Sequence, residues 1–600
     1  MAISADLRAL TRGRAWVRWL KRLWANDHII LGGLAILIGV AAGLAAIGFR
    51  YGIDLFRALA YGNWIVDELF NSYAAQMPWW RMLLATTLGG LAIGLFLRYV
   101  MPDRKPQGVA DVIESVALRG GQLRATDGFK AATLSAASIG VGASVGREGP
   151  VVHLGASLAS CLAGWLHLGR RLTRTLLGCG VAAAIAASFN APIAGVFFAL
   201  EVVVGHYALS AFAPIVIASV AGTVVSRMHY GDFPAFILPQ SYEIASFWEF
   251  PAFALLGLAA ALLAIVFTQS VAVSAKLFER AKIPVVLRPA VAGLAIGCIA
   301  LAYPEVLGVG YEATDKALQA LYSFETLVIL LVLKVAATAI CLGAGFGGGV
   351  FSPSLFIGAM LGGAFGIVAT QLFPELSSGS GAYTVIGMGA VAGAVLGAPI
   401  STILMIFELT GDYELTIALM VATAIASVVV QQANMASFFA WQLARRGVNL
   451  RRGQETEILN ETKVRSLLDS NYATVAPEAP FAEVRDALVR APFGELMVCD
   501  GEGALRGTIT FAELAHLAFD SEAQEKLTAE DLARKRPPVL LADDGLSTAI
   551  RVFQTSAEPH LPVVDSKQSR RLLGFVHEHE AMTAYHRALQ QVRREESGDP

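Results

Sequence analysis

The stretch Gly146-Arg147-Glu148-Gly149-Pro150 and a second stretch, Gly349-Val350-Phe351-Ser352-Pro353, decide how the rest of the sequence is interpreted. Each is followed, at the same distance from its proline, by a Gly-Ala pair at residues 155–156 and 358–359. Further along, an Ala-Pro-Ile tripeptide precedes Glu201 in one half and Glu408 in the other at equal spacing. This repeated order indicates an internal duplication, which in membrane proteins is often inverted.

The composition predicts an integral membrane protein. Hydrophobic residues make up 55% of the 600 residues and charged residues only 16%, whereas soluble domains carry about 25% charged residues. Residues 335–374 contain no Asp, Glu, Lys or Arg, as expected for chain in contact with hydrocarbon. A net charge of -2 by itself says nothing about nucleic acid, but the sequence has no basic patch with interleaved aromatic residues, so no nucleic-acid partner is expected.

The chain divides into five predicted segments. A basic cytoplasmic segment, residues 1–28, precedes an uncharged run at 29–49, and basic flanks remain on the cytoplasmic side. Residues 29–447 form the predicted membrane domain, and residues 448–461 a linker. Two segments at 462–520 and 527–590 repeat a β-α-β-β-α order and resemble a tandem pair of cystathionine β-synthase (CBS) domains, an α+β fold. The five scattered cysteines form no metal-binding pattern.

Residues 146–150 have the chemistry of an anion site. A Gly-rich stretch that ends in proline at a helix start presents free backbone N–H groups and the positive end of the helix dipole. Residues 349–353 supply a second such helix start, and Gly108 before the run 109–118 is a candidate third. Glu148 lies among these donors, and a carboxylate within a membrane marks a functional site. When ionised, it would compete with the anion for the same N–H groups. The alternative is that Glu148 only caps its helix.

These motifs resemble those of the CLC family of chloride channels and proton-coupled exchangers, over about residues 30–447. The resemblance implies an all-α polytopic membrane domain, built as an inverted repeat of broken helices, that forms a homodimer with one pore per subunit. It also implies that Glu148 is the gating residue. The implied anion-binding residues are Gln107, Gly108, Val109, Gly146, Arg147, Gly149, Val350, Phe351 and Phe439.

Three positions depart from the family pattern. Gln107 stands where the first motif has a serine, and Phe439 stands where the last membrane helix has a tyrosine. An amide can still donate a hydrogen bond, whereas a phenyl ring cannot. Val202, next to Glu201, occupies the position at which exchangers carry an inward-facing proton glutamate. Glu201 and Glu408 themselves are expected to be structural.

The CBS pair keeps part of a ribose-binding pattern in Thr508, Thr510 and Glu513, while the second domain lacks the hydroxyl. An adenine nucleotide is therefore one candidate ligand there, and a purely structural or dimerising role is the alternative.

The sequence thus predicts a multi-pass chloride channel of the cell membrane with both termini cytoplasmic. The predicted activity is passive conduction of chloride and other small anions. No cofactor or metal is expected to be required, and no enzymatic activity is expected. The first alternative is a chloride/proton exchanger that uses a different inner proton path. A CBS-regulated divalent-cation transporter is disfavoured, because the motifs gather helix N-termini around one carboxylate.

Overall fold

The computed structural model describes residues 27–62, 70–205, 207, 209–232, 236, 244–433, 437–448, 462–515, 526–556 and 558–597. The chain separates into two compact units, residues 1–450 and 451–600. Apart from residues 27, 28 and 448, the predicted N-terminal segment and linker lie outside the described residues, as do residues 516–520 at the end of the first predicted CBS domain.

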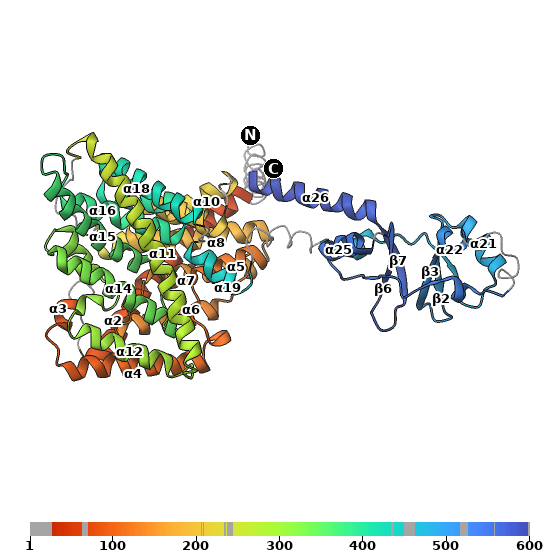
Figure 1. Cartoon of the computed structure of the whole chain (residues 1–600), viewed down its shortest axis with the longest axis horizontal. Helices are drawn as coiled ribbons and strands as arrows, with labels where there is room; N and C mark the ends of the chain where they lie inside the picture. Colours follow the sequence, from red (N-terminus) through yellow and green to blue (C-terminus); the bar gives the residue numbers. More distant parts are fainter. Residues whose placement is uncertain are drawn as a thin grey trace, which may run out of the picture. The chain divides into compact units, whose positions relative to one another are not determined.

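The first unit is helical (Figure 1), which confirms the predicted fold class. Among the described residues, eight helices are long and apolar enough to span a membrane. They are α2 (Asp27–Tyr61), α4 (Trp79–Tyr99), α8 (Arg170–Phe189), α10 (Leu209–Tyr230), α11 (Phe250–Arg280), α14 (Phe324–Ala344), α15 (Phe351–Leu372) and α18 (Tyr413–Gln432).

Shorter helices fill the space between the long ones. They are α3 (Phe70–Ala74), α5 (Val109–Leu118), α6 (Ala125–Gly140), α7 (Glu148–Trp165), α9 (Pro192–Phe198), α12 (Arg288–Ala300), α13 (Tyr311–Leu318), α16 (Ser380–Leu396), α17 (Pro399–Thr410) and α19 (Phe438–Arg445). The run α7–α8–α9 in the first half corresponds in order to α15–α16–α17 in the second. The predicted helix breaks therefore exist, and they fall at matching places in the two halves.

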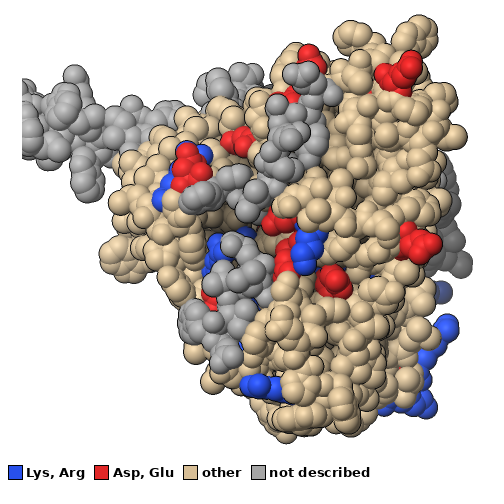
Figure 2. All heavy atoms as spheres, turned by 90° about the vertical axis from the view of Figure 1, so that its left-hand side faces the viewer, with Lys and Arg blue, Asp and Glu red and all other residues tan. Residues whose placement is uncertain are grey.

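The outer surface of the first unit is apolar. Large hydrophobic side chains such as Leu59, Trp165, Met228 and Leu262 are each more than 60% exposed. On the face drawn in Figure 2, Lys, Arg, Asp and Glu are few and lie in scattered groups among other residues. Such a surface would be unstable in water but suits contact with lipid.

Glycines allow α15 and α16 to pack with their backbones in close contact. A Cβ on Gly362 would lie 2.1 Å from the carbonyl oxygen of Tyr383, and a Cβ on Gly358 would lie 2.5 Å from that of Gly387. Both distances are far below van der Waals contact. Small residues at helix interfaces are the usual way to pack helices in a bilayer, where hydrophobic attraction between helices is absent.

The two halves are joined directly at their Gly-rich motifs. The Gly146 N–H donates to the Gly349 carbonyl oxygen at 2.7 Å, and the Gly349 N–H donates back to Gly146 at 2.7 Å. A side chain at Gly146 would come within about 3 Å of the Glu148 carboxylate and of the Gly349 carbonyl oxygen. This two-residue bridge brings the starts of α7 and α15 together.

Glu201 and Glu408 form reciprocal helix caps, in agreement with their expected structural role. Glu201, in the π-helical turn η3 (Ala199–Val204), accepts hydrogen bonds from the Ile400 and Ser401 N–H groups at 3.1 and 2.8 Å, at the start of α17. Glu408, in α17, accepts from the Ile193 and Ala194 N–H groups at 2.8 Å each, at the start of α9. Each half therefore supplies the carboxylate that satisfies the other half's exposed helix donors.

The second unit contains two small sheets. The first has the order β1-β2-β3-β4 and the second β5-β6-β7; in each, the first pair is parallel and the next antiparallel. The strands are β1 (Ala473–Val475), β2 (Glu495–Cys499), β3 (Leu505–Thr510), β4 (Arg534–Lys535), β5 (Leu540–Leu541), β6 (His560–Val564) and β7 (Leu572–His577). The helices are α21 (Phe481–Arg490), α22 (Phe511–Ala515), α24 (Ala529–Leu532), α25 (Leu546–Ser556) and α26 (Glu578–Ser597). Each half has a hydrophobic core of its own, and a third cluster lies between the sheets.

Candidate anion site

Three helix N-termini surround one cavity of about 460 Å³ in the first unit. The helices are α5, α7 and α15, so the cavity is faced by the positive ends of three dipoles, each equivalent to roughly half a charge. The lining residues predicted from the sequence are Gln107, Gly108, Val109, Glu148, Gly149, Val350, Phe351 and Phe439. Residues that are far apart in the chain are therefore brought to one site with the chemistry of anion binding.

The Glu148 side chain is 1% exposed and is held by α13 and α15. Its Oε1 accepts a hydrogen bond from the Tyr311 hydroxyl at 2.9 Å. The Ser352 hydroxyl also donates to Oε1, and the Ser352 N–H donates to Oε2 at 3.3 Å. The carboxylate thus accepts from a backbone N–H in the first turn of α15, where a bound anion would find its donors.

Gly146 and Arg147 support the site from outside the cavity. The N–H and carbonyl groups of Gly146 are both hydrogen-bonded to Gly349. The Arg147 guanidinium lies 4.5 Å from the centre of the Tyr311 ring, its Nε is 3.9 Å from Glu148 Oε1, and it donates to the Ser188 carbonyl oxygen at 3.4 Å. The cation therefore neutralises charge behind Glu148 rather than lining the cavity.

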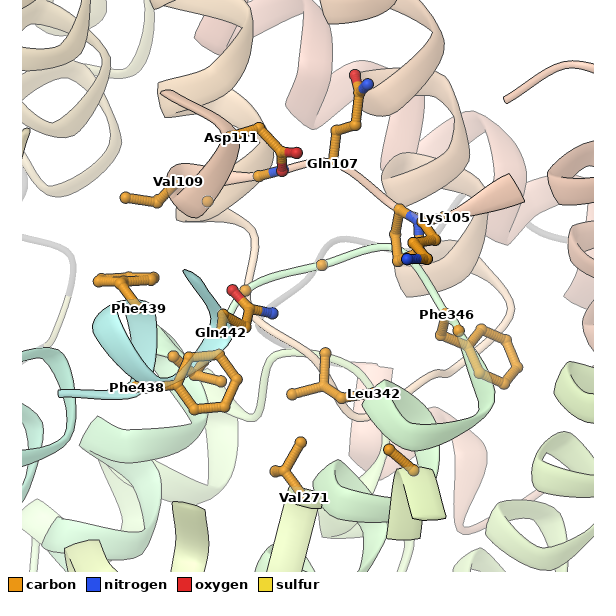
Figure 3. A pocket seen from close by; sticks show the side chains of 18 of the residues that line it. Lys105, Gln107, Val109, Asp111, Val271, Leu342, Phe346, Phe438, Phe439 and Gln442 are labelled. Carbon is orange, nitrogen blue, oxygen red and sulfur yellow. The ribbon is translucent and has the colours of Figure 1, made fainter. Parts of the chain in front are cut away.

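Beside Phe439, the cavity is lined by side chains that were not among the predicted site residues. Figure 3 shows Gln442 and the Phe438 and Phe439 rings on one side of the cavity and Phe346 on the other. Gln442 lies one helical turn beyond Phe439 in α19 and carries an amide donor. The Gln107 side chain extends away from Gln442 in this view. Gln442 was missed because an amide in a short amphipathic helix carries no sequence signature.

The predicted donor at Gly108 is already partly occupied. The Gly108 N–H donates to Asp111 Oδ2 at 2.8 Å, and Asp111 in turn accepts from Arg446 at 2.8 Å. A Cβ on Gly108 would meet nothing within 4 Å, so open space lies beside this residue. The start of α5 therefore faces the cavity while one of its N–H groups is capped internally.

Val202 lies in the π-helical turn η3 and is half-buried against the hydrophobic core. The structure places no ionisable side chain at this position, and the neighbouring Glu201 carboxylate is engaged at the start of α17.

Comparison with known proteins agrees with this geometry. The profile of the family described as "Voltage gated chloride channel" matches residues 89–431. A ClcB-like chloride channel protein of Ralstonia nicotianae is 35% identical over 416 residues, which are 69% of this chain and 96% of that protein. This chain belongs to the CLC family.

The relatives of this chain include proteins named as chloride channels and proteins named as proton-coupled chloride exchangers. The H(+)/Cl(-) exchange transporter ClcA of Vibrio cholerae serotype O1 is 28% identical over 66% of this chain and 86% of that protein. The crystal structure of a slow cyanobacterial Cl-/H+ antiporter has the same fold, with a TM-score of 0.62 and 23% identity over 69% of this chain and 97% of that one. The CBS domain profile matches residues 464–520 and 529–587, which confirms that this CLC protein carries a CBS pair.

The candidate nucleotide residues of the CBS pair already form contacts with each other. The Thr510 hydroxyl and N–H both donate to Glu513 Oε2, at 2.5 and 2.8 Å, and these hydrogen bonds hold the pKa of Glu513 below its usual range even though desolvation opposes them. Thr508 is buried at 6% exposure. A ribose would have to displace the Thr510–Glu513 contact in order to bind Glu513.

A histidine–glutamate pair joins the two CBS domains. Glu495, at the start of β2, lies 3.1 Å from His560 Nδ1, at the start of β6. The pKa of Glu495 is raised to about 7, chiefly by burial; the nearby Glu513 carboxylate adds to the rise and Arg534 opposes it. Burial, together with the neighbouring His577, lowers the pKa of His560. Just below pH 7, where Glu495 is protonated and His560 is still neutral, the contact is therefore a hydrogen bond between uncharged groups.

Because the pKa of Glu495 is raised, we predict that the CBS unit loses stability as pH rises. The folded state holds a proton on Glu495 that the unfolded state releases above pH 4.5. The free energy of unfolding therefore contains the full stabilisation from this proton below pH 4.5. That stabilisation, at most about 3 kcal/mol, is lost as pH rises through 7. The lowered pKa of His560 acts in the opposite direction only below pH 6.5.

Urea unfolding of the 451–600 fragment at several pH values between 5 and 8 would measure this loss. The Glu495→Gln variant removes the titrating group, so its stability relative to the natural fragment should improve as pH rises. Parallel pH curves for the two proteins would contradict the prediction.

Proposed function

We propose that this CLC protein is a chloride channel that conducts passively through one pore in each subunit of a homodimer, with Glu148 as its gate. The observation that carries the proposal is the position of the Glu148 carboxylate, which accepts the Ser352 N–H at the start of α15. An ionised Glu148 occupies a place that an anion would need, and a protonated one gives it up. The backbone N–H groups of Gly149, Val350 and Phe351 are the proposed anion donors.

Passive conduction is favoured by what lies at the inner proton position. Exchange requires a relay of titratable groups or water through apolar protein to reach the gate. Val202 cannot carry a proton, and the Glu201 carboxylate is fixed by the N–H groups of Ile400 and Ser401. Neither residue offers a mobile proton carrier.

The charged residues that line the cavity favour an anion over a cation. Its cationic lining residues are Arg104, Lys105, Arg288, Arg445 and Arg446, and its acidic ones, apart from Glu148, are Asp103, Asp111 and Glu279. Arg446 is paired with Asp111, and Arg445 with Glu279. Among these lining residues the remaining cations outnumber the remaining acids, so the electrostatic field in the cavity attracts anions.

We predict that the reversal potential of the purified protein in a planar bilayer follows the chloride gradient alone. A passive channel reverses at the chloride equilibrium potential, whatever the pH difference across the membrane. The measurement compares a threefold chloride gradient at symmetric pH with the same gradient plus two pH units. The control is Val202→Glu, which restores a carboxylate at the inner proton position.

A shift of the natural protein's reversal potential with the pH gradient would overturn the passive mechanism and favour the exchanger. A shift seen only in Val202→Glu would support Val202 as the position that breaks the proton path.

We propose residues 29–447 as the transport domain and the segments 462–520 and 527–590 as a cytoplasmic regulatory pair, with both chain termini cytoplasmic and the cell membrane as the location. A weak adenine-nucleotide site at Thr508, Thr510 and Glu513 is one proposed role of the CBS pair, and a purely structural or dimerising role is the alternative. We expect weak binding at most, because the second domain lacks the hydroxyl. Calorimetry with ATP and AMP on the 451–600 fragment tests this, and tight binding would contradict it.

A further inference from the structure

Tyr311 is a buried hydroxyl donor that contacts the gate and belongs to neither repeated motif. It is the first residue of α13, is 7% exposed, and donates to Glu148 Oε1 at 2.9 Å. We propose that Tyr311 is a positioning residue for the gate: its hydroxyl holds the ionised Glu148 carboxylate at the start of α15 and so sets the pH at which the pore opens. This inference rests on the proposed gating role of Glu148.

The hydroxyl distinguishes the two protonation states of Glu148. An ionised carboxylate only accepts hydrogen bonds, so the O–H groups of Tyr311 and Ser352 both fit it. Hydrogen bonds to an ionised acceptor are roughly twice as strong as those between neutral groups. Protonation of Glu148 therefore weakens the contact with Tyr311 and favours departure of the side chain from the start of α15.

The Tyr311 ring is fixed in place by neighbours on two sides. The Arg147 guanidinium lies over the ring at 4.5 Å from its centre, and the Phe236 ring packs against it edge-on with centroids 5.0 Å apart. The hydroxyl consequently has little freedom to turn away from Glu148.

The loop before α13 is anchored by a buried lysine. Lys334, in α14, is fully buried and donates to the carbonyl oxygens of Val306 and Gly308 at 3.1 and 3.0 Å. Gly310 then adopts a left-handed conformation with φ of 93°, which directs the chain into α13. A side chain at Gly310 would collide with the Phe356 ring, 2.6 Å from the added Cβ. Lys334 thus fixes the backbone that carries Tyr311.

Among the described residues, the contacts around the Glu148 carboxylate include two charged or titratable groups. Arg147 approaches from the residue that precedes α7, and Tyr311 from α13. The partner from α15 is Ser352, which does not titrate. Because Tyr311→Phe keeps the ring beneath Arg147, that variant removes only the hydroxyl.

The test measures chloride efflux from liposomes between pH 4 and 8 for the full chain. We expect Tyr311→Phe to move the half-maximal pH of efflux upward by about one unit, since the ionised gate loses a charge-assisted hydrogen bond. The matched control is Tyr383→Phe, which removes the hydroxyl of another buried tyrosine, one that lies near a different carboxylate, Glu249. It should leave the half-maximal pH unchanged.

A second pair of variants separates failure of this inference from failure of the gate. Glu148→Gln should abolish the pH dependence, and Tyr311→Phe added to it should then shift nothing. If Glu148→Gln flattens the profile but Tyr311→Phe leaves the midpoint in place or lowers it, the role of Tyr311 is overturned and the gate stands. If the profile persists in Glu148→Gln, the gate and the inference both fail. Tyr311→Met, which also lacks the hydroxyl, replaces the Phe variant if that protein does not fold.

Discussion

Replacing Glu148 with alanine is expected to raise chloride flux roughly tenfold at pH 7 and to make it independent of pH. In the structure the carboxylate accepts the Ser352 N–H at 3.3 Å and therefore competes with the anion for the start of α15. The competition depends on ionisation, and the protonated fraction of a weak acid falls about tenfold per pH unit above its midpoint. Efflux of chloride from liposomes, followed with an electrode between pH 4.5 and 8, measures both effects.

The control for this variant is Glu408→Gln. Glu408 is also a glutamate of the membrane unit, but its carboxylate caps α9 and is absent from the described lining of the cavity. The Glu408→Gln variant should show the same dependence of chloride flux on pH as the natural protein. A pH profile for Glu148→Ala that matches that of the natural protein would exclude Glu148 as the gate.

Gly362→Ala is expected to destabilise the membrane unit severely. The added methyl group would lie 2.1 Å from the Tyr383 carbonyl oxygen, and backbone atoms cannot move aside as a flexible side chain can. Overpacking of this kind costs about 1–3 kcal/mol and can cost more. The thermal unfolding temperature in detergent should fall by several degrees, and flux per molecule should fall with it because α15 begins at the anion site.

Gly33→Ala is the matched substitution in another membrane helix. Gly33 is in α2, and a Cβ there would meet nothing within 4 Å. Alanine also favours a helix over glycine by about 1 kcal/mol, so this variant should unfold no earlier than the natural protein. Equal unfolding temperatures for the two variants would show that the α15–α16 contact tolerates a methyl group.

Local pattern was sufficient to predict most of the architecture. The β-α-β-β-α order predicted for the segment 462–520 is present as β1, α21, β2, β3 and α22, and the order predicted for 527–590 is present as β5, α25, β6, β7 and α26. Both follow from hydrophobic periodicity and turn residues, which act over a few neighbours. The starts of α7 and α15 were likewise visible, because glycine and proline mark a helix start locally.

Contacts between segments that are far apart in the sequence could not be predicted from local sequence pattern. The partners of Glu148 come from α13 and α15, and nothing near Tyr311 in the sequence indicates that its hydroxyl meets that carboxylate. Lys334 was likewise missed, since its carbonyl partners at Val306 and Gly308 form a site only after α14 packs beside their loop. Pairings of this kind depend on tertiary packing rather than on local sequence.

The mutual hydrogen bonds between Gly146 and Gly349 have a consequence for biosynthesis. At ~5–20 residues per second, a ribosome needs on the order of 10–40 s to extend the chain from the first glycine to the second. During that interval α7 can enter the membrane while Gly146 lacks its partner strand and Glu148 lacks the Ser352 donors. Unsatisfied polar groups are costly in hydrocarbon, so the nascent first half must keep this region hydrated or shielded by the insertion machinery. The anion site is thus completed only after the second half of the chain has been translated.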